Sequence, residues 1–244
     1  MMVGLKKTGW GMVMVVAVCM AMAGLNPPPA AAGSYSLLPA ADAMLWSGEP
    51  NNNYGNHTPL SAFAYTGSNT RSLLRFDLSA IQDAEIITQA TLRLYRHAFY
   101  IVAPATSVTA DLYRVASDSW GEMAVTWNNQ PAPASLLGAL TLTSGDPLQG
   151  WMYYSLPVGG GSNWVGDLND NAVSFLLKLN NESLATQRVY WRSDEYPENP
   201  PTTHPHLDIT TIPIPLPGGA LLAGSGFMAL LWRRWRRKER SNAS

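Results

Sequence analysis

The feature that most constrains this chain is a series of short segments in which apolar and polar residues alternate. A period of two is typical of β-strands that bury one face and expose the other. The clearest segments are 74–78, 90–95, 108–113 and 173–179. Loops rich in proline, glycine and asparagine separate them, for example at 49–55, 128–133 and 197–205. Residues 136–140 also allow a short helix. The pattern predicts an all-β fold: an antiparallel β-sandwich of the jelly-roll kind.

Charge is distributed unevenly along the chain. Residues 33–217 contain 8 of the 16 basic residues and 16 of the 17 acidic ones, which gives this region a net charge of −8. An acidic domain repels phosphate backbones, so we expect no nucleic-acid partner. The only cysteine, Cys19, precedes this region. We therefore expect neither a disulfide framework nor thiol chemistry in the domain.

The N-terminal residues 1–32 have the three parts of a secretory signal peptide. Lys6 and Lys7 form a basic start, residues 11–23 are apolar, and small residues follow at 21–23 and 30–32. This order predicts export, with cleavage after Ala32 preferred over Ala23. The competing interpretation is an uncleaved anchor.

The C-terminal residues 212–244 combine a proline-spaced motif, a short apolar run at 218–232 and a basic block. Positive charge after the run predicts that the tail stays cytoplasmic and the domain faces outward. The segment resembles the PEP-CTERM sorting signals of Gram-negative bacteria in their Val-Pro-Leu-Pro variant, although it lacks Pro-Glu-Pro and has Ile214 in place of valine. The resemblance implies recognition by an exosortase-like membrane protease, and a link to extracellular polysaccharide and biofilm. The residues that carry it are Pro213, Pro215, Leu216, Pro217, Arg233, Arg234, Arg236 and Arg237.

Between these ends, residues 33–211 carry several motifs in a familiar order. They include Asn-Asn-Asn-Tyr-Gly at 51–55, Leu-Leu-Arg-Phe-Asp-Leu-Ser at 73–79, Val-Thr-Trp-Asn-Asn-Gln-Pro at 125–131 and Tyr-Trp-Arg-Ser at 190–193. This order resembles the DNRLRE domain, a family of secreted microbial β-sandwiches related to carbohydrate-binding module family 96. The resemblance implies an accessory or binding module.

The sequence contains none of the usual catalytic motifs. No Gly-x-Ser-x-Gly elbow is present, and the glycines at 159–161 lack the strand–loop–helix context of a phosphate site. Glu122 with Asp194 and Glu195 could supply the two carboxylates of a glycoside hydrolase or lyase. His204 and His206 form the best metal-like pair, for which a loop without metal is the competing interpretation. We expect no enzyme activity, with a polysaccharide-degrading enzyme as the alternative.

Aromatic, amide and arginine side chains are the candidates for sugar binding. A flat aromatic ring can stack on the apolar face of a pyranose, while polar side chains bond its hydroxyl groups. The candidates are Trp46, Asn53, Tyr54, Arg75, Trp127, Asn128 and Arg192. For Trp127, as for Trp191, burial in the core is the favoured interpretation. Arg75 could instead pair with Asp77, and Asn128 could serve a turn. No cofactor is expected, although Asp42 or Asp77 could hold a structural Ca²⁺.

Together these features predict a secreted or surface-displayed module without enzyme activity that binds or embeds in extracellular polysaccharide. A structural matrix or adhesion protein without sugar affinity is a second alternative.

Overall fold

The computed structural model describes residues 32–81, 85–159, 164–183, 187–197 and 202–214. Residues 1–31 of the predicted signal peptide lie outside this part of the chain. So do the sorting residues Pro215, Leu216, Pro217, Arg233, Arg234, Arg236 and Arg237. In the described part, no helix is both long enough and apolar enough to cross a membrane.

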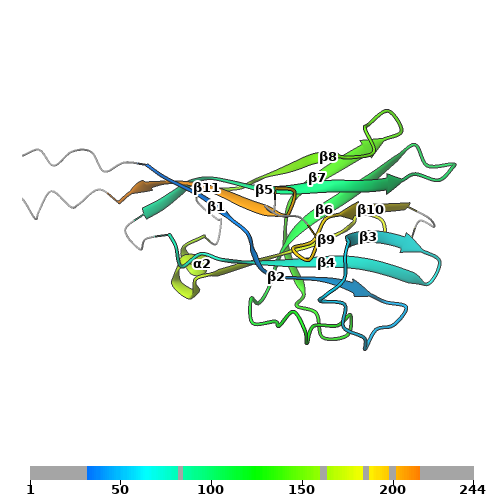
Figure 1. Ribbon diagram of the computed structural model, residues 1–244, viewed down its shortest axis with the longest axis horizontal. Coiled ribbons are helices and arrows are strands. Elements are labelled where there is room, and N and C mark those ends of the chain that lie inside the picture. Colours follow the sequence, from blue (N-terminus) through cyan, green and yellow to red (C-terminus); the bar gives the residue numbers. More distant parts are fainter. Residues whose placement is uncertain (1–31, 82–84, 160–163, 184–186, 198–201, 215–244) are drawn as a thin grey trace, which may run out of the picture. The chain divides into compact units, whose positions relative to one another are not determined.

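The domain consists of antiparallel strands, as the alternating pattern predicts (Figure 1). The strands are β1 (Gly33–Leu37), β2 (Pro39–Trp46), β3 (Leu60–Tyr65), β4 (Ser68–Asp77), β5 (Glu85–Tyr100), β6 (Ser107–Val115), β7 (Pro133–Thr143), β8 (Gly150–Leu156), β9 (Ala172–Leu179), β10 (Gln187–Trp191) and β11 (His206–Pro213). One short helix, α2 (Trp164–Asp170), precedes β9.

The strands form two layers that belong to one curled sheet (Figure 1). One layer has the order β8–β5–β11–β1, and the other has the order β2–β4–β9–β6–β7. The pair β10–β3 joins them, because β10 bonds to β5 on one side and to β3 on the other. The β3–β4 hairpin turns through Thr66 and Gly67, where Gly67 has a φ of +77° that a residue without Cβ adopts at little cost.

The main core fills the space between the two layers. It is built from the inward positions of the alternating segments, such as Leu74 and Phe76 on β4, Leu92 and Leu94 on β5, and Phe175 on β9. Each of these side chains has no solvent exposure. Burial at every second residue confirms the period of two that the sequence shows.

A second apolar cluster lies on the other side of the β2–β4–β9 layer. Ala43 and Leu45 of β2 pack there with Leu73 of β4, under Trp120 and Val125 from the β6–β7 loop. The strand β4 is therefore buried on both faces, because the long loop at 116–132 covers the side that would otherwise meet water.

Three local features of the structure differ from what the sequence pattern predicts. Residues 136–140 belong to β7 and not to a helix. The glycines at 159–161 lie between β8 and α2, so a strand and a helix do flank them, contrary to the expectation from the sequence. The helix ends before Asn171, whose φ of 59° is suited to a helix C-terminus. The last strand also continues to Pro213, two residues beyond the expected domain boundary at 211, and pairs with the start of β5.

Candidate functional site

The outer face of the β8–β5–β11 layer carries a row of aromatic rings and arginines. Tyr95 and Arg93 point outward from β5, opposite Trp151 and Tyr153 of β8 in the strand register. Trp151 meets Tyr95 edge-on, with ring centroids 5.4 Å apart, and the guanidinium of Arg93 lies 5.1 Å from the Trp151 ring. Tyr153 is 53% exposed. The strand period of two thus brings four large side chains to one open surface.

The row continues along β5 towards β10 and β3. Arg192 follows β10 and lies 4.7 Å from the ring of Tyr95 and 3.9 Å from that of Tyr196. Farther on, Arg188 lies 4.8 Å from the Tyr100 ring and 5.3 Å from that of Phe63. We call this surface the aromatic–arginine face; its residues are Phe63, Arg93, Tyr95, Tyr100, Trp151, Tyr153, Arg188, Tyr190, Arg192 and Tyr196.

The aromatic–arginine face is more basic than the domain as a whole. It holds three of the eight arginines and lysines of residues 33–217. Arg93 pairs with Asp208 of β11 at 2.5 Å, and Ser36 of β1 donates to the same carboxylate. Arg192 donates to the hydroxyl of Thr203. The face can therefore stack rings on a sugar and present N–H donors to hydroxyl or carboxylate groups.

Of the sugar-contact candidates from the sequence, only Arg192 lies on this face. Trp46, Asn53 and Tyr54 belong to the region around the 49–57 loop. Trp46 donates to Ser68 at 2.5 Å, and the Tyr54 hydroxyl donates to Glu49 at 2.5 Å. Burial, together with this second bond, raises the Tyr54 pKa. These contacts hold the loop in place.

The Asn-Asn-Asn-Tyr-Gly motif also secures the β6–β7 loop. The side-chain amide of Asn53 donates to the carbonyl oxygens of Glu122 and Val125 at 2.6 and 2.7 Å. A Cβ on Gly55 would lie 2.4 Å from the carbonyl oxygen of Glu122, so only glycine fits without a shift. Asn128 likewise donates to Asn51 at 2.8 Å. The motif is thus a clamp between two loops.

Arg75 and Trp127 take part in the packing of the covered layer. Arg75 donates to the carbonyl oxygens of Asp118 and Trp120 and lies 5.3 Å from the Trp120 ring. It does not form the expected pair with Asp77, which accepts from the backbone N–H of Ser79 at 2.8 Å.

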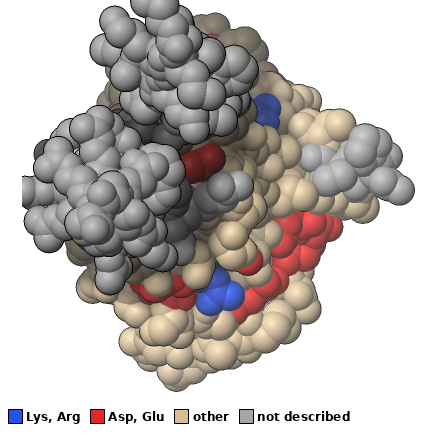
Figure 2. Space-filling view, turned by 90° about the vertical axis from the view of Figure 1, so that its left-hand side faces the viewer, with Lys and Arg blue, Asp and Glu red and all other residues tan. Residues whose placement is uncertain are grey.

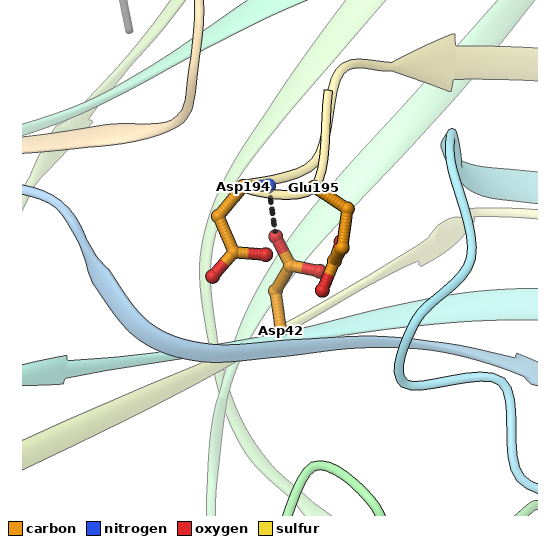
Figure 3. Close-up of side chains that lie close together, drawn as sticks. All are labelled: Asp42, Asp194 and Glu195. Atoms are coloured by element: carbon orange, nitrogen blue, oxygen red, sulfur yellow. Dashed lines mark hydrogen bonds between the residues drawn. The ribbon is translucent and has the colours of Figure 1, made fainter. Parts of the chain in front are cut away.

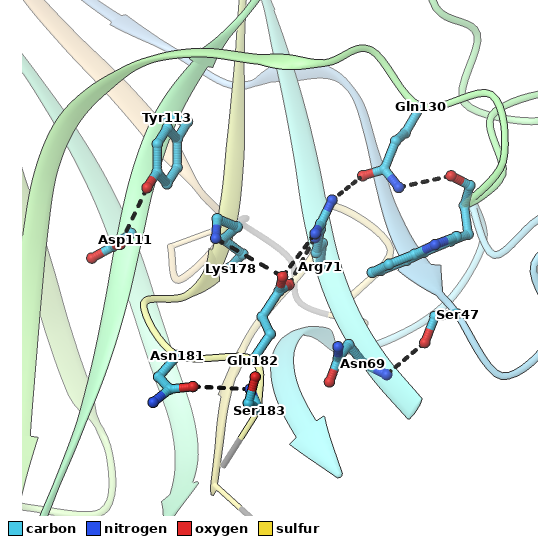
Figure 4. Close-up of polar contacts among 11 residues, drawn as sticks. Ser47, Asn69, Arg71, Asp111, Tyr113, Gln130, Lys178, Asn181, Glu182 and Ser183 are labelled. Atoms are coloured by element: carbon cyan, nitrogen blue, oxygen red, sulfur yellow. Dashed lines mark hydrogen bonds and ion pairs between the residues drawn. The ribbon is translucent and has the colours of Figure 1, made fainter. Parts of the chain in front are cut away.

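Trp127 lies partly buried against the second cluster, 4.4 Å from the guanidinium of Arg71. Arg71 in turn makes a bidentate pair with Glu182, both bonds 2.7 Å long, and donates to Gln130 (Figure 4). Trp191 is fully buried in the main core, as predicted.

Arg93, Tyr95, Trp151 and Tyr153 are not among the residues that the sequence suggested for sugar binding. A signal for them exists: Trp151 and Tyr153 are two residues apart, as are Arg93 and Tyr95, so each pair must share a face of its strand. Nothing local says that this face is open, because that depends on which loops cover which layer.

Three carboxylates from distant parts of the chain converge beside β2. Asp42 of β2 points between Asp194 and Glu195, which follow β10 (Figure 3). One oxygen from each lies within 4.8 Å of the others, and the backbone N–H of Asp194 donates to Asp42 at 2.9 Å. Burial, reinforced by the neighbouring carboxylates, raises the pKa of Asp42 well above its usual value and that of Asp194 to about 6. These groups are the strongest metal-ligand candidates among the described residues.

A second acidic group, Asp118, Asp167 and Asp170, lies near α2. It borders a cleft of about 480 Å³ lined by α2 and residues 114–119. Arg114 forms an ion pair with Asp167, so this group already has a cation. Figure 2 views the domain from this end and shows acidic side chains gathered into patches with few basic ones between them.

Glu122 of the β6–β7 loop contacts Glu195, so the structure brings together the carboxylates that the sequence suggested for glycoside hydrolysis. The two candidate histidines are placed differently. His204 is buried against the carbonyl oxygen of Tyr196, whereas His206 faces Ser36 and the Trp151 ring. Within the described residues, neither histidine belongs to a group of three metal-ligand side chains.

An antiparallel β-sandwich with an open row of rings and arginines suits a module that binds carbohydrate. The comparison with protein families agrees: the model of carbohydrate-binding module family 96 matches residues 34–207, and the chain belongs to this family. This confirms the family 96 part of the resemblance. No curated protein matches the chain. Among solved structures, the chain is similar to a cleaved adhesin domain of Lys-gingipain from Porphyromonas gingivalis. The two are 10% identical, the match covers 73% of this chain and 97% of that one, and the TM-score is 0.28.

Proposed function

We propose that this chain is a secreted or surface-displayed module that binds extracellular polysaccharide through the aromatic–arginine face. The observation that carries the proposal is the row of Tyr95, Trp151 and Tyr153 with Arg93 and Arg192 on an open sheet face. Family membership supports a carbohydrate ligand. Rings supply stacking area at low entropic cost, and the guanidinium groups favour polysaccharides that carry carboxylates.

The proposal includes delivery to the cell surface of a Gram-negative bacterium. Residues 1–32 would direct export, and residues 212–244 would hold the protein in the membrane until an exosortase-like protease acts on the tail. The DNRLRE-type motifs and the basic block at 233–240 support this assignment. Replacing Arg233, Arg234, Arg236 and Arg237 by alanine should leave the protein unprocessed, as mass spectrometry of the cell-surface fraction would show.

The test is retention of the purified protein on a panel of acidic and neutral polysaccharides. We expect retention on an acidic polysaccharide, and a tenfold to hundredfold loss of affinity for Trp151→Ala. Tyr54→Ala is the matched control, because Tyr54 is an aromatic residue of the loop that the sequence first suggested. Greater loss in the control than in Trp151→Ala would move the site to that loop.

The same panel separates the alternatives. Folded protein with no retention on any polysaccharide would favour a structural matrix or adhesion protein. Release of new reducing ends, abolished by Asp194→Asn without loss of fold, would favour a polysaccharide-degrading enzyme that uses Glu122 or Asp194.

A further inference from the structure

The cluster of Asp42, Asp194 and Glu195 is electrostatically incomplete. Asp42 has no solvent exposure at all, although it is a carboxylate. No lysine, arginine or histidine of the described residues lies within ion-pair distance of any of the three. Each carboxylate also has a buried oxygen without a hydrogen-bond partner: Oδ1 of Asp42, Oδ1 of Asp194 and Oε2 of Glu195.

Burying such groups costs several kcal/mol each unless a proton or a cation compensates them. In the acidic group near α2, a cation of the chain compensates the carboxylates, because Arg114 forms an ion pair with Asp167. Among the described residues, Asp42 accepts only from the backbone N–H of Asp194, which bonds to Oδ2 and leaves Oδ1 without a hydrogen-bond partner. Figure 3 shows Asp42 directed into the space between its two neighbours.

We propose that Asp42, Asp194 and Glu195 bind a calcium ion. The donors are all hard oxygens, which calcium prefers, and none is the nitrogen or sulfur typical of zinc sites. Calcium–oxygen distances of roughly 2.3–2.6 Å place two ligands of one ion up to about 5 Å apart. The three oxygens, all within 4.8 Å of one another, fit around such an ion. The hydroxyl of fully buried Ser193 lies beside Glu195 and offers a fourth oxygen.

The ion would tie β2 to the segment between β10 and β11. That segment starts with Arg192 and contains Tyr196, two residues of the aromatic–arginine face. Bound calcium would therefore hold this part of the face in its stacked arrangement. The metal site itself does not depend on the proposed polysaccharide ligand, because its donors come from the chain alone.

The experiment is calorimetric titration of the chelator-treated, purified protein with CaCl₂, together with its melting temperature. We expect one ion per chain and a rise of about 5–10 °C in Tm at a concentration roughly 100-fold above Kd. Asp42→Asn and Glu195→Gln should each weaken binding at least tenfold. Without calcium, Asp42→Asn should melt no lower than the wild type, because it removes an uncompensated buried charge.

The matched control is Asp170→Asn in the second acidic group, which should bind calcium as the wild type does. Absence of both heat and Tm shift in the wild-type protein would overturn the proposal, as would unchanged binding by both cluster variants. An equal response to MgCl₂ would overturn the assignment to calcium. Because Glu195 is partly exposed, Glu195→Gln keeps the test valid if Asp42→Asn fails to fold. Polysaccharide retention is measured separately, so either proposal can fail alone.

Discussion

On the outer side of each layer of the sandwich, an arginine lies over a tryptophan ring, but the two pairs differ in how far they are covered. On the β2–β4–β9 layer, Arg75 lies over Trp120, a ring that the 116–132 loop packs against the layer and buries. On the β8–β5–β11 layer, Arg93 lies over Trp151, and the surface stays open. An arginine over an indole is thus not itself a sign of function; what decides its role is whether another segment excludes water from it.

Removing the covered ring should have the largest effect on stability. Trp120 is 7% exposed and donates to Ser174 at 3.0 Å, so Trp120→Ala leaves a cavity and an unpaired hydroxyl. We expect a loss of about 3–5 kcal/mol in the free energy of unfolding, measured by urea denaturation. Trp151→Ala should cost less than about 1 kcal/mol. Equal losses would contradict the distinction between the layers.

Replacing an arginine of the open face should weaken polysaccharide binding more than replacing an arginine of the covered layer. Arg192→Ala is expected to lower affinity for an acidic polysaccharide about tenfold and to flatten its dependence on salt, because one cationic donor of the open face is gone. Arg71→Ala, which removes a guanidinium from the covered layer, should leave both quantities unchanged. Affinity electrophoresis at two ionic strengths would measure this, and a similar loss in both variants would argue against the open face as the site.

For stability, an arginine of the covered layer should matter more than one of the open face. Arg71→Ala breaks the bidentate pair with Glu182 and uncovers Trp127, which we expect to cost about 1 kcal/mol, since the pair is only partly exposed. Arg188→Ala is the matched control, because Arg188 lies over two rings of the open face without an ion pair in the described structure. Thermal melts would rank the two variants, and a lower Tm for Arg188→Ala would reverse the expectation.

The smallest effect should come from Asp77 at the exposed end of β4. Its pKa lies below the ordinary 3.8 because the Ser79 backbone N–H bonds to the carboxylate. A lowered pKa stabilises the fold above that ordinary value, and the contribution disappears as the pH falls through the lowered one. Asp77→Ala should therefore cost on the order of 0.5 kcal/mol at pH 7, with solvent screening, and progressively less as the pH falls below 3.8. A cost that stays constant with pH would exclude this cause.

Much of the fold follows from local pattern, and much of the candidate site does not. The alternation around Leu74 and Phe76 predicts strand and core because a period of two puts every second residue on one face. The same rule pairs Trp151 with Tyr153 but cannot say whether their face is open. Trp46 and Tyr54 looked accessible beside a polar loop, yet the folded chain engages both: Trp46 donates to Ser68 and Tyr54 donates to Glu49.

The sequence by itself determined the all-β class, the inward positions of the strands, the acidic charge of the domain and the motifs that place it in its family. Only the tertiary structure decided which arginines and tryptophans are covered, and it brought Asp42 to Asp194 across 152 positions of the chain. The physical reason is that strand periodicity is a local property of a few residues, whereas burial and charge compensation depend on segments far apart in sequence meeting in the folded state.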